Sequence, residues 1–439
     1  MKKRMCKIMA LAMTAAMVVP MAAQTTAFAA DDKEITYWNI AVESPDKDIV
    51  TAAVDKFNKE TESGYTVNSV AIQNDTYKEK LVIAMSSGEC PDMYSSWSGG
   101  PMYEYIDSGF AQPIDDLLDQ SDIKDKLLDA AIEQGSYKGH VYAIPYMNVV
   151  LAGIFYNKDM FKQYGLEEPK TLADLENICA TLKENGITPF ALANASKWTG
   201  SMYFMSLAAR YGGLEPFQNA VAGTGKFTDD CFIKAGEKIQ EWVNNGYFPD
   251  GVNSLSEDDG QAKQLMYQET AGMLLCGSWY TGTFQTDSEE FYQKIGWFPF
   301  PAIDDSDADP TIQIGTVGDQ FISFNCEGDK LAAAFECAAD HLSDEVEDMI
   351  YSTGKIAPVK DAGDHISDPV VKEIFDAAQE ASSIQLWYDQ YLPTSVASAH
   401  LDGLQEVFGL TKTPQEAQEE MQTAMDEYLS TKSDSGAAD

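Results

Sequence analysis

Ile35-Thr-Tyr-Trp-Asn-Ile40 opens the stretch of sequence that decides the fold. It is typical of a strand, and Val50, Val54 and Phe57 then recur at the spacing of one helix face. The alternation repeats with a β-branched strand at 65–72, a helix that Gly88 ends, and a short strand at 91–94. A β-α-β-α-β order predicts parallel strands covered by helices on both faces. The chain therefore begins with an α/β lobe.

A second unit begins near Val149, where an apolar strand is expected to run to Tyr156. Thr171 and Asp174 have the spacing of a capping box at the start of the next helix. Trp242 lies on the apolar face of a later helix and is expected in the core. With 439 residues, the chain is too long for one ordinary core, so we expect two domains.

The first 29 residues have the pattern of a signal peptide. A basic start precedes the uncharged run from Ile8 to Val19, and Ala27-Phe28-Ala29 places small residues where a signal peptidase reads. We expect cleavage near Ala29 and a secreted protein. The formal net charge of −40 becomes −44 without the four basic residues of this segment. Such a charge repels phosphate backbones and anionic headgroups, so we expect no binding to nucleic acid or directly to membranes.

The sequence shows no catalytic or metal-binding signature that we recognise, so we expect no catalytic residues, metal or cofactor. Gly223-Thr-Gly-Lys226 lacks the first glycine and the Ser/Thr of a phosphate loop, and we interpret it as a turn. Asp305, Asp307 and Asp309 have a calcium-loop rhythm, but Pro310 replaces the required glycine. The six cysteines after residue 29 are scattered singly; we expect mostly buried thiols, and one or two bridges remain open.

Eight segments, in this order, resemble the family 1 extracellular solute-binding proteins of bacterial ABC sugar importers. They are Ile35-Thr-Tyr-Trp-Asn39, Gly88-Glu-Cys-Pro-Asp-Met-Tyr94 with Trp97-Ser-Gly-Gly100, Tyr142-Ala-Ile-Pro-Tyr146, Phe155-Tyr-Asn-Lys-Asp159, Pro169-Lys-Thr-Leu-Ala-Asp-Leu175, Gly272-Met-Leu-Leu-Cys-Gly-Ser-Trp279, Asp389-Gln-Tyr-Leu-Pro393 and the helix that begins Thr413-Pro-Gln-Glu416. Each segment alone is a weak signal, and their order makes the resemblance specific. It covers nearly the whole chain after the signal peptide.

The resemblance implies an α/β, two-lobed periplasmic-binding-protein-like fold, in which each lobe is a mostly parallel sheet flanked by helices. Hinge strands join the lobes, with crossings expected near 149–156, 312–319 and 355–360. The expected divisions are a signal peptide at 1–29, an N-terminal lobe at 30–150 plus 315–357, a C-terminal lobe at 151–314 plus 358–430, and a disordered tail at 431–439.

The same resemblance implies the substrate-binding component of an ABC transporter. It would capture a carbohydrate, most plausibly an oligosaccharide, in the interlobe cleft and deliver it to the membrane permease subunits. We expect a monomer without a lipid anchor, because the only early cysteine, Cys6, lies inside the basic start. A binder of peptides or other small solutes on the same fold stays open. A secreted glycosidase also stays open, because counting cannot exclude a pair of carboxylates among 70 acids.

Sugar binding needs aromatic faces for the C–H surfaces of the ligand and fixed polar groups for its hydroxyls. Trp97, Trp279 and Trp387 stand in loop-like contexts, and we expect them to contact the ligand rather than fill the core. The complete set of expected ligand-binding residues is Trp38, Asn39, Asn74, Asp75, Trp97, Tyr146, Trp198, Trp279, Asp319, Trp387 and Asp389. For each tryptophan the alternative is ordinary packing, and for each polar residue it is a turn cap or a solvated side chain.

Overall fold

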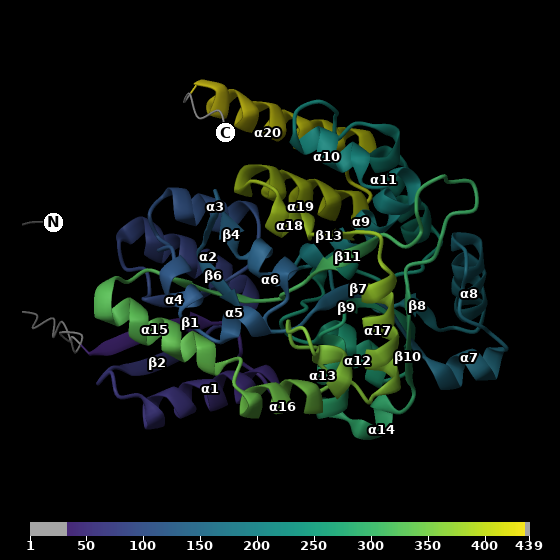
Figure 1. Cartoon of the computed structure of the whole chain (residues 1–439). Helices are drawn as coiled ribbons and strands as arrows, with labels where there is room; N and C mark the ends of the chain where they lie inside the picture. The colour runs from purple at the N-terminus through teal and green to yellow at the C-terminus, as the bar shows by residue number, and fades with distance from the viewer. Residues whose placement is uncertain (1–32, 435–439) are drawn as a thin grey trace, which may run out of the picture.

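A computed structural model describes residues 33–434, and the expected signal peptide lies outside this range. The molecule consists of two α/β lobes side by side, with β1, β2 and α1 in one and β7 to β10 in the other (Figure 1). The first lobe contains β1 (Glu34–Asn39), α1 (Asp46–Glu60), β2 (Thr66–Ala71), α2 (Asn74–Ser87), β3 (Met93–Ser96), α3 (Gly100–Asp107), α4 (Asp115–Asp119), α5 (Ile123–Lys126), α6 (Asp129–Gln134), β4 (Ser136–Tyr137), β5 (His140–Val141), β6 (Ala143–Pro145), β12 (Phe321–Phe324), α15 (Gly328–Asp340) and α16 (Asp344–Ser352).

The second lobe takes the middle of the chain and, after a return crossing, its end. It contains β7 (Val150–Asn157), α7 (Lys158–Tyr164), α8 (Leu172–Glu184), β8 (Thr188–Phe190), α9 (Trp198–Gly212), α10 (Glu215–Val221), α11 (Asp230–Asn244), a 3-10 turn (Val252–Ser254), α12 (Gln261–Tyr267), β9 (Ala271–Gly277), α13 (Tyr280–Asp287), α14 (Glu289–Tyr292), β10 (Ile295–Pro299), β11 (Gln313–Thr316), a 3-10 turn (Ala362–His365), α17 (Pro369–Glu380), β13 (Ile384–Gln385), α18 (Tyr388–Tyr391), α19 (Thr394–Phe408) and α20 (Pro414–Asp434).

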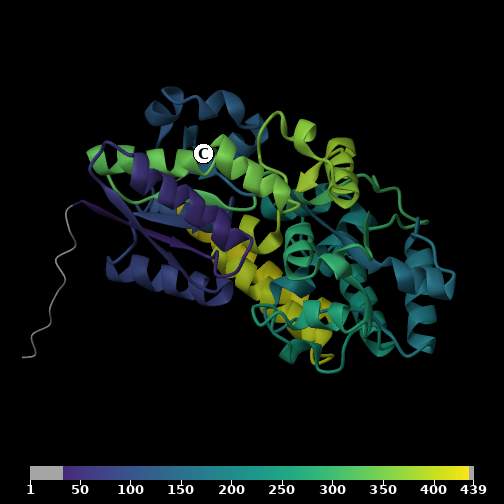
Figure 2. The same cartoon turned by 90° about the horizontal axis from the view of Figure 1, so that it is seen from below.

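The opening β-α-β-α-β order is confirmed. β1 pairs in parallel with both β2 and β3, and the expected helix residues Val50, Val54 and Phe57 are buried on the inner face of α1. Gly88 ends α2 with φ of 76°, a left-handed conformation that suits glycine. Figure 2 shows α1 and α15 lying over one face of the sheet formed by β1 and its neighbours, with α2 on the other.

The sheets are mixed rather than mostly parallel. The first has the strand order β2-β1-β3-β12-β6, and the second β13-β11-β7-β9-β8 with β10 also paired to β7. In the first sheet β12 is antiparallel to β3 and β6, and in the second β7 is antiparallel to β9, β10 and β11. The reason is topological. β6 leads out of the first lobe and β12 leads back in, while β7 and β11 do the reverse in the second lobe, so these neighbours must run in opposite directions.

The chain passes between the two sheets in three segments, at 146–149, 317–320 and 353–368. Asn148, which is buried, connects all three. Its Oδ1 accepts the N–H of Ile356 at 2.8 Å, and its carbonyl accepts the N–H of Asp319 at 2.8 Å. The next residue, Val149, donates its N–H to the Ile356 carbonyl at 2.7 Å. One short run of backbone therefore aligns all the connections between the lobes.

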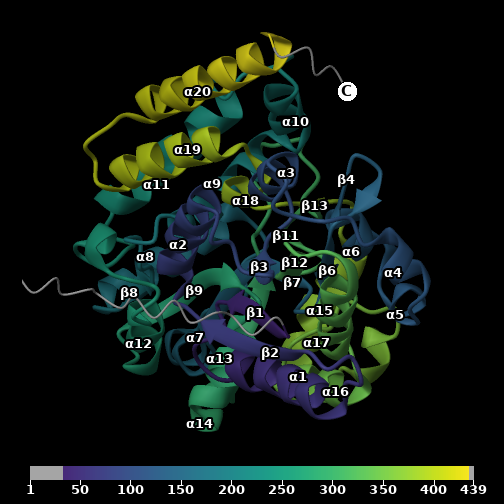
Figure 3. The ribbon, with the colours of Figure 1, turned by 90° about the vertical axis from the view of Figure 1, so that its left-hand side faces the viewer.

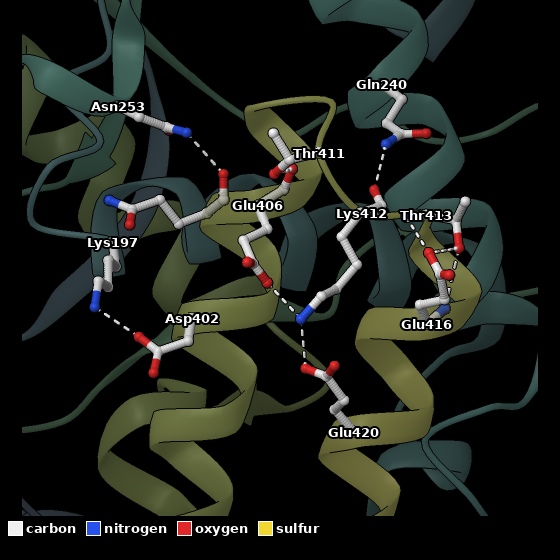
Figure 4. A network of polar contacts seen from close by, with 11 residues as sticks. Lys197, Gln240, Asn253, Asp402, Glu406, Thr411, Lys412, Thr413, Glu416 and Glu420 are labelled. Atoms are coloured by element: carbon white, nitrogen blue, oxygen red, sulfur yellow. Dashed lines mark hydrogen bonds and ion pairs between the residues drawn. The ribbon is translucent and has the colours of Figure 1, made fainter.

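The C-terminal helices α19 and α20 form an antiparallel pair that packs on α11 (Figure 3). Lys412, in the turn between them, forms ion pairs with Glu406 and Glu420 (Figure 4). Thr413 caps α20, because its Oγ1 accepts the N–H of Glu416 and the Glu416 carboxylate accepts the N–H of Thr413. The helix start expected at Thr413 is confirmed, and the two bonds form a capping box.

The expected disordered tail at 431–439 lies partly within the described residues. α20 continues to Asp434, and 435–439 lie outside the described residues. The Thr431 hydroxyl donates to the Tyr428 carbonyl at 2.7 Å. A Ser/Thr side chain that bonds the preceding turn can remain in a helix even where the sequence is polar.

The core confirms the positions that were predicted from the sequence. Trp242 is fully buried and stacks on Phe190 at a centroid distance of 5.6 Å, so its expected place in the core is confirmed. The capping box of Thr171 and Asp174 is also present. All six cysteines between residues 33 and 434 are free thiols. None of the helices in this range is long and apolar enough to cross a bilayer.

Asn148→Ala is expected to destabilise the fold by about 1–3 kcal/mol, because it leaves the buried N–H of Ile356 without an acceptor. Chemical denaturation measures the change. Asn68→Ala is the matched control, since Asn68 is exposed on β2 and bonds only the Glu34 side chain there, so it is expected to stay within about 0.5 kcal/mol. Equal stability of the two variants would contradict the role given to Asn148.

Candidate functional site

A cavity of about 830 Å³ lies between the two lobes. Its walls come from both lobes, from the 317–320 crossing and from the segment around α18. The lining residues are Ile40, Asp46, Asn74, Lys78, Trp97, Trp198, Met202, Met205, Glu257, Asp258, Trp279, Asp319, Gln320, Trp387, Asp389 and Gln390. Aromatic side chains and a set of polar groups line it together, as in pockets that bind small organic ligands.

Seven of the eleven expected ligand-binding residues line this cavity, although they are spread over more than 300 positions of sequence. They are Asn74, Trp97, Trp198, Trp279, Asp319, Trp387 and Asp389. Trp97 follows β3, Trp279 lies between β9 and α13, Trp198 begins α9, and Trp387 precedes α18. The tryptophans thus stand where strands end or helices begin, the usual position of ligand sites in α/β folds.

The other four, Trp38, Asn39, Asp75 and Tyr146, do not line the cavity. Trp38 packs in the small hydrophobic cluster of the first lobe. Asn39 is buried and closes a local turn, since its Oδ1 accepts the N–H of Ala41 and its Nδ2 donates to Ser69. Tyr146 is fully buried behind the wall, where its hydroxyl donates to Gln320 Oε1 at 2.7 Å. Tyr146 therefore orients a lining residue from behind.

Three indoles stand in a row along the wall. The ring centroids of Trp198 and Trp279 are 6.0 Å apart, and those of Trp279 and Trp387 are 6.1 Å apart, both in edge-to-face geometry. A Cβ at Gly277 would lie 2.0 Å from the Trp279 ring, so the glycine makes room for the indole to fold back on β9. Because indole rings are rigid, the row offers a ligand an apolar surface at little cost in side-chain entropy.

Trp387 differs from the expectation that it would contact ligand and not fill the core. It lines the cavity, but only 2% of its surface is exposed. The short sequence Trp-Tyr-Asp looks like a loop, yet the indole belongs to the hydrophobic core and meets the Trp279 ring edge to face. Trp97, Trp198 and Trp279 are only partly buried.

Two glycines bring the first lobe against the segment that contains Trp387 and Asp389. A Cβ on Gly99, whose φ is 114°, would lie 2.2 Å from the Gln390 carbonyl oxygen. A Cβ on Gly100 would lie 2.2 Å from the Leu392 carbonyl oxygen. Only a chain without side chains at both positions allows this backbone approach. It places Trp97, just before the glycines, on the same cavity as Asp389.

Polar contacts cross between the lobes at the mouth of the cavity. Asp75, at the start of α2, donates its N–H to Asp258 Oδ2 at 3.1 Å and accepts the indole N–H of Trp198 at 3.3 Å. Lys78, one turn further along α2, lies 3.5 Å from Asp389 Oδ2 and 5.0 Å from the centroid of the Trp97 ring. The expected residue Asp75 thus holds the lobes together at the rim, outside the lining.

The carboxyl groups inside the cavity have unusual acidity. Burial raises the pKa of Glu257 to about 7, although the Tyr280 hydroxyl donates to it and opposes the rise. Burial likewise raises the pKa of Asp319 to about 7, against the lowering effect of Lys355. The pKa of Asp258 is raised by burial and then by the charge of Asp75. Near neutral pH, Glu257 and Asp319 can therefore donate as well as accept hydrogen bonds.

Sequence reasoning missed nine lining residues. Gln320 and Gln390 are direct neighbours of the expected Asp319 and Asp389, so adjacency could have suggested them. Lys78 lies one helical turn after the expected Asn74. Ile40, Asp46, Met202, Met205, Glu257 and Asp258 carried no local signal that separates them from ordinary surface or core positions. Only the meeting of the two lobes brings them together.

A second cavity of about 750 Å³ adjoins the first and shares Ile40, Asp46, Glu257, Asp258 and Trp279 with it. The space between the lobes therefore extends beyond the row of indoles, toward α13 and the crossing at Lys355. Among residues 33–434 no group of three or more His, Cys, Asp or Glu side chains has the arrangement of a metal site.

Two α/β lobes joined by three crossings around a cavity lined by aromatic and polar side chains define a solute-binding protein of the periplasmic type. Residues 41–339 match the model of the bacterial extracellular solute-binding protein family, and the chain belongs to that family. The fold and the family inferred from the eight sequence segments are thereby confirmed.

Individual relatives agree with this assignment. The chain is 31% identical to an uncharacterized ABC transporter extracellular-binding protein of Pyrococcus horikoshii over 51% of this chain and 50% of that protein. It is 28% identical to a maltotriose-binding protein of Pyrococcus abyssi over 54% and 48%. These matches span about half the length of the curated relatives. A solved structure from work on xylan utilization by Caldanaerobius polysaccharolyticus superposes with a TM-score of 0.81 and 29% identity, covering 89% of this chain and 99% of that one.

Glu257→Gln is expected to gain stability relative to the unaltered protein as pH rises from 5 to 8. The folded state holds the Glu257 proton up to a pKa of about 7, so its contribution is lost as pH rises from the unfolded value near 4.5 through 7. Glutamine does not titrate, so its contribution to the free energy of unfolding does not change over this pH range. The difference in unfolding free energy between the variant and the unaltered protein is expected to grow by about 1–2 kcal/mol. This is less than the full pKa shift would give, because Glu257 is partly exposed.

Urea denaturation of both proteins at pH 5 and pH 8 measures this difference, and the buried histidines cancel because both proteins contain them. Asp319→Asn is expected to change in the same direction. A difference that stays constant over this range would contradict the assigned acidity.

Proposed function

We propose that this protein captures a carbohydrate, specifically an oligosaccharide, between its lobes and delivers it to the membrane permease of an ABC transporter. The observation that carries the proposal is the interlobe cavity, in which a row of indoles faces carboxyl and amide groups from both lobes. Indole faces match the C–H surfaces of sugar rings, and the polar groups match the hydroxyls.

The relatives support an oligosaccharide as the cargo. The Pyrococcus abyssi relative is named for maltotriose, and the solved structure comes from work on xylan utilization. The adjoining cavity provides space for a ligand longer than one ring. A secreted monomer, released by cleavage near Ala29 and working with a permease, is the form in which we propose that it acts.

Closure of the lobes is part of the proposed mechanism. The crossings at 146–149, 317–320 and 353–368 would serve as the hinge, with Asn148 at their centre. The hydrogen bonds of Asp75 with Asp258 and Trp198 join the lobes across the mouth and can form only when the lobes are together. Ligand that contacts both walls therefore favours the closed arrangement.

A thermal-shift screen against monosaccharides, xylo-, malto- and chito-oligosaccharides tests the function. A ligand at a hundred times its Kd adds about 2.7 kcal/mol to stability, so a true ligand is expected to raise the Tm by several degrees. Failure of every sugar, together with a shift by a short peptide, would favour a binder of another solute class on the same fold.

Trp279→Ala is expected to weaken sugar binding about tenfold to a hundredfold while the fold stays nearly as stable. If a sugar covers roughly 100 Å² of the indole, about 25 cal/mol per Å² gives some 2.5 kcal/mol, or nearly two decades of affinity. Calorimetric titration measures the loss, and denaturation measures stability. Trp97→Ala is likewise expected to weaken sugar binding while leaving the fold nearly as stable.

Two other tryptophans are matched controls. Trp242→Phe, in the core of the second lobe, is expected to lower stability and leave affinity unchanged. Trp387→Ala is expected to reduce both, because the residue is buried and lines the cavity. Unchanged affinity in Trp279→Ala would show that this indole only packs.

Binding is expected to reduce the radius of gyration measured by solution scattering, because the contacts across the mouth require the lobes to meet. Asp258→Ala, which removes the acceptor for the Asp75 N–H, is expected to need more sugar for the same compaction. An identical radius with and without saturating sugar would favour a rigid site.

A further inference from the structure

The charges that line the cavity are strongly unbalanced. Five acidic residues face it: Asp46, Glu257, Asp258, Asp319 and Asp389. Among the described lining residues, Lys78 is the single basic one. The imbalance is local, since it belongs to a cavity with only partial access to solvent and not to the acidic outer surface.

Only two of these five acids have a cationic partner. Lys78 lies 3.5 Å from Asp389, whose side chain is 9% exposed. Lys355, 2% exposed, forms an ion pair with Asp46 behind the wall. Within residues 33–434, Glu257, Asp258 and Asp319 form no ion pair. Nearby lysines lower the pKa of each carboxyl, Lys263 for Glu257, Lys78 for Asp258 and Lys355 with Lys78 for Asp319, but burial outweighs them.

The three unpaired carboxyls are held in place by neutral donors or by their own backbone. Tyr280 donates its hydroxyl to Glu257, the N–H of Asp75 donates to Asp258, and the N–H of Asp319 is bound to the Asn148 carbonyl. Their raised pKa values show that the site already resists negative charge. At pH 7.5, above the pKa of about 7 of Glu257 and Asp319, a further anion would meet mostly ionised carboxyls at these two positions and would also lose its hydration.

We infer that the cavity takes uncharged oligosaccharides and excludes those that carry a carboxylate, sulfate or phosphate group, with Glu257, Asp258 and Asp319 as the discriminating residues. The inference rests on the proposed function. A sugar hydroxyl both donates and accepts, so it can pair with a carboxyl in either protonation state, whereas an anionic substituent can only accept. Lys78 cannot compensate, because it is already paired with Asp389.

The test compares three ligands on the full-length secreted form by calorimetric titration at pH 7.5. They are the tightest neutral trisaccharide among xylotriose, maltotriose and chitotriose, a derivative with a carboxylate on C5 of one ring, and the amide of that derivative. The amide adds the same bulk without charge. We expect the acid to bind at least tenfold more weakly than its amide, at each ring position that the amide tolerates.

Variants of the lining residues test which of them cause the weaker binding of the acid. Asp258→Asn and Asp319→Asn are each expected to reduce the ratio of the Kd of the acid to the Kd of its amide at least threefold. Asp259→Asn, an exposed neighbour outside the lining, is expected to leave it unchanged. Lys78→Gln removes the one cation of the lining and is expected to raise this ratio. This last variant tests the inference even if neither Asn variant folds.

The outcomes separate the two levels of the proposal. An acid that binds as tightly as its amide, while the neutral sugar binds well, would overturn the inference and leave the proposed function intact. An acid that binds more tightly would show that Lys78 recognises anionic sugars. If no neutral trisaccharide binds, the proposed function fails and the inference fails with it.

Discussion

Everything that the two lobes do together depends on the hydrogen bonds around Asn148. Three crossings carry the chain between the sheets, and this one buried residue bonds the backbone of the other two. Asn148 in the first crossing thus holds both the second crossing, which leads back into the first lobe, and the third, which enters the second lobe again. The walls of the cavity keep their relative position because their connections share this fixed point. In the proposed closure, a rotation about it would change the width of the mouth without unfolding either sheet.

The site itself is assembled by close backbone approach more than by side-chain contacts. Gly99 and Gly100 allow α3 to meet the chain just after α18, and Gly277 allows the Trp279 ring to lie against its own strand. These glycines leave room for bulky aromatics and place Trp97 and Trp387 on one cavity. The same approach brings acids from distant parts of the chain into one poorly hydrated space, which is why their protons are held so tightly.

Local features could be predicted from the sequence, and features that depend on the meeting of distant segments could not. The alternating elements before Tyr94, the capping box at Thr171 and the core position of Trp242 follow from spacing within a few turns of chain. The antiparallel neighbours in both sheets depend on how often the chain crosses between lobes, which no local pattern records. Glu257 has the surroundings of a surface acid in sequence, but the fold places it on the cavity wall beside Tyr280.

The same distinction between local and long-range features applies to the expected ligand residues. Tryptophans in polar, glycine-rich surroundings mark strand ends or helix starts, and four of the five expected ones line the cavity. Asn39 and Tyr146 carry equally suitable groups but use them to bond Ala41 and Gln320. The contacts that join α2 to Asp258, Trp198 and Asp389 have a kinetic consequence. A molecule enclosed behind them leaves only after they break, so its residence time is governed by the opening of the protein, and ligands of quite different affinity can share one rate of escape.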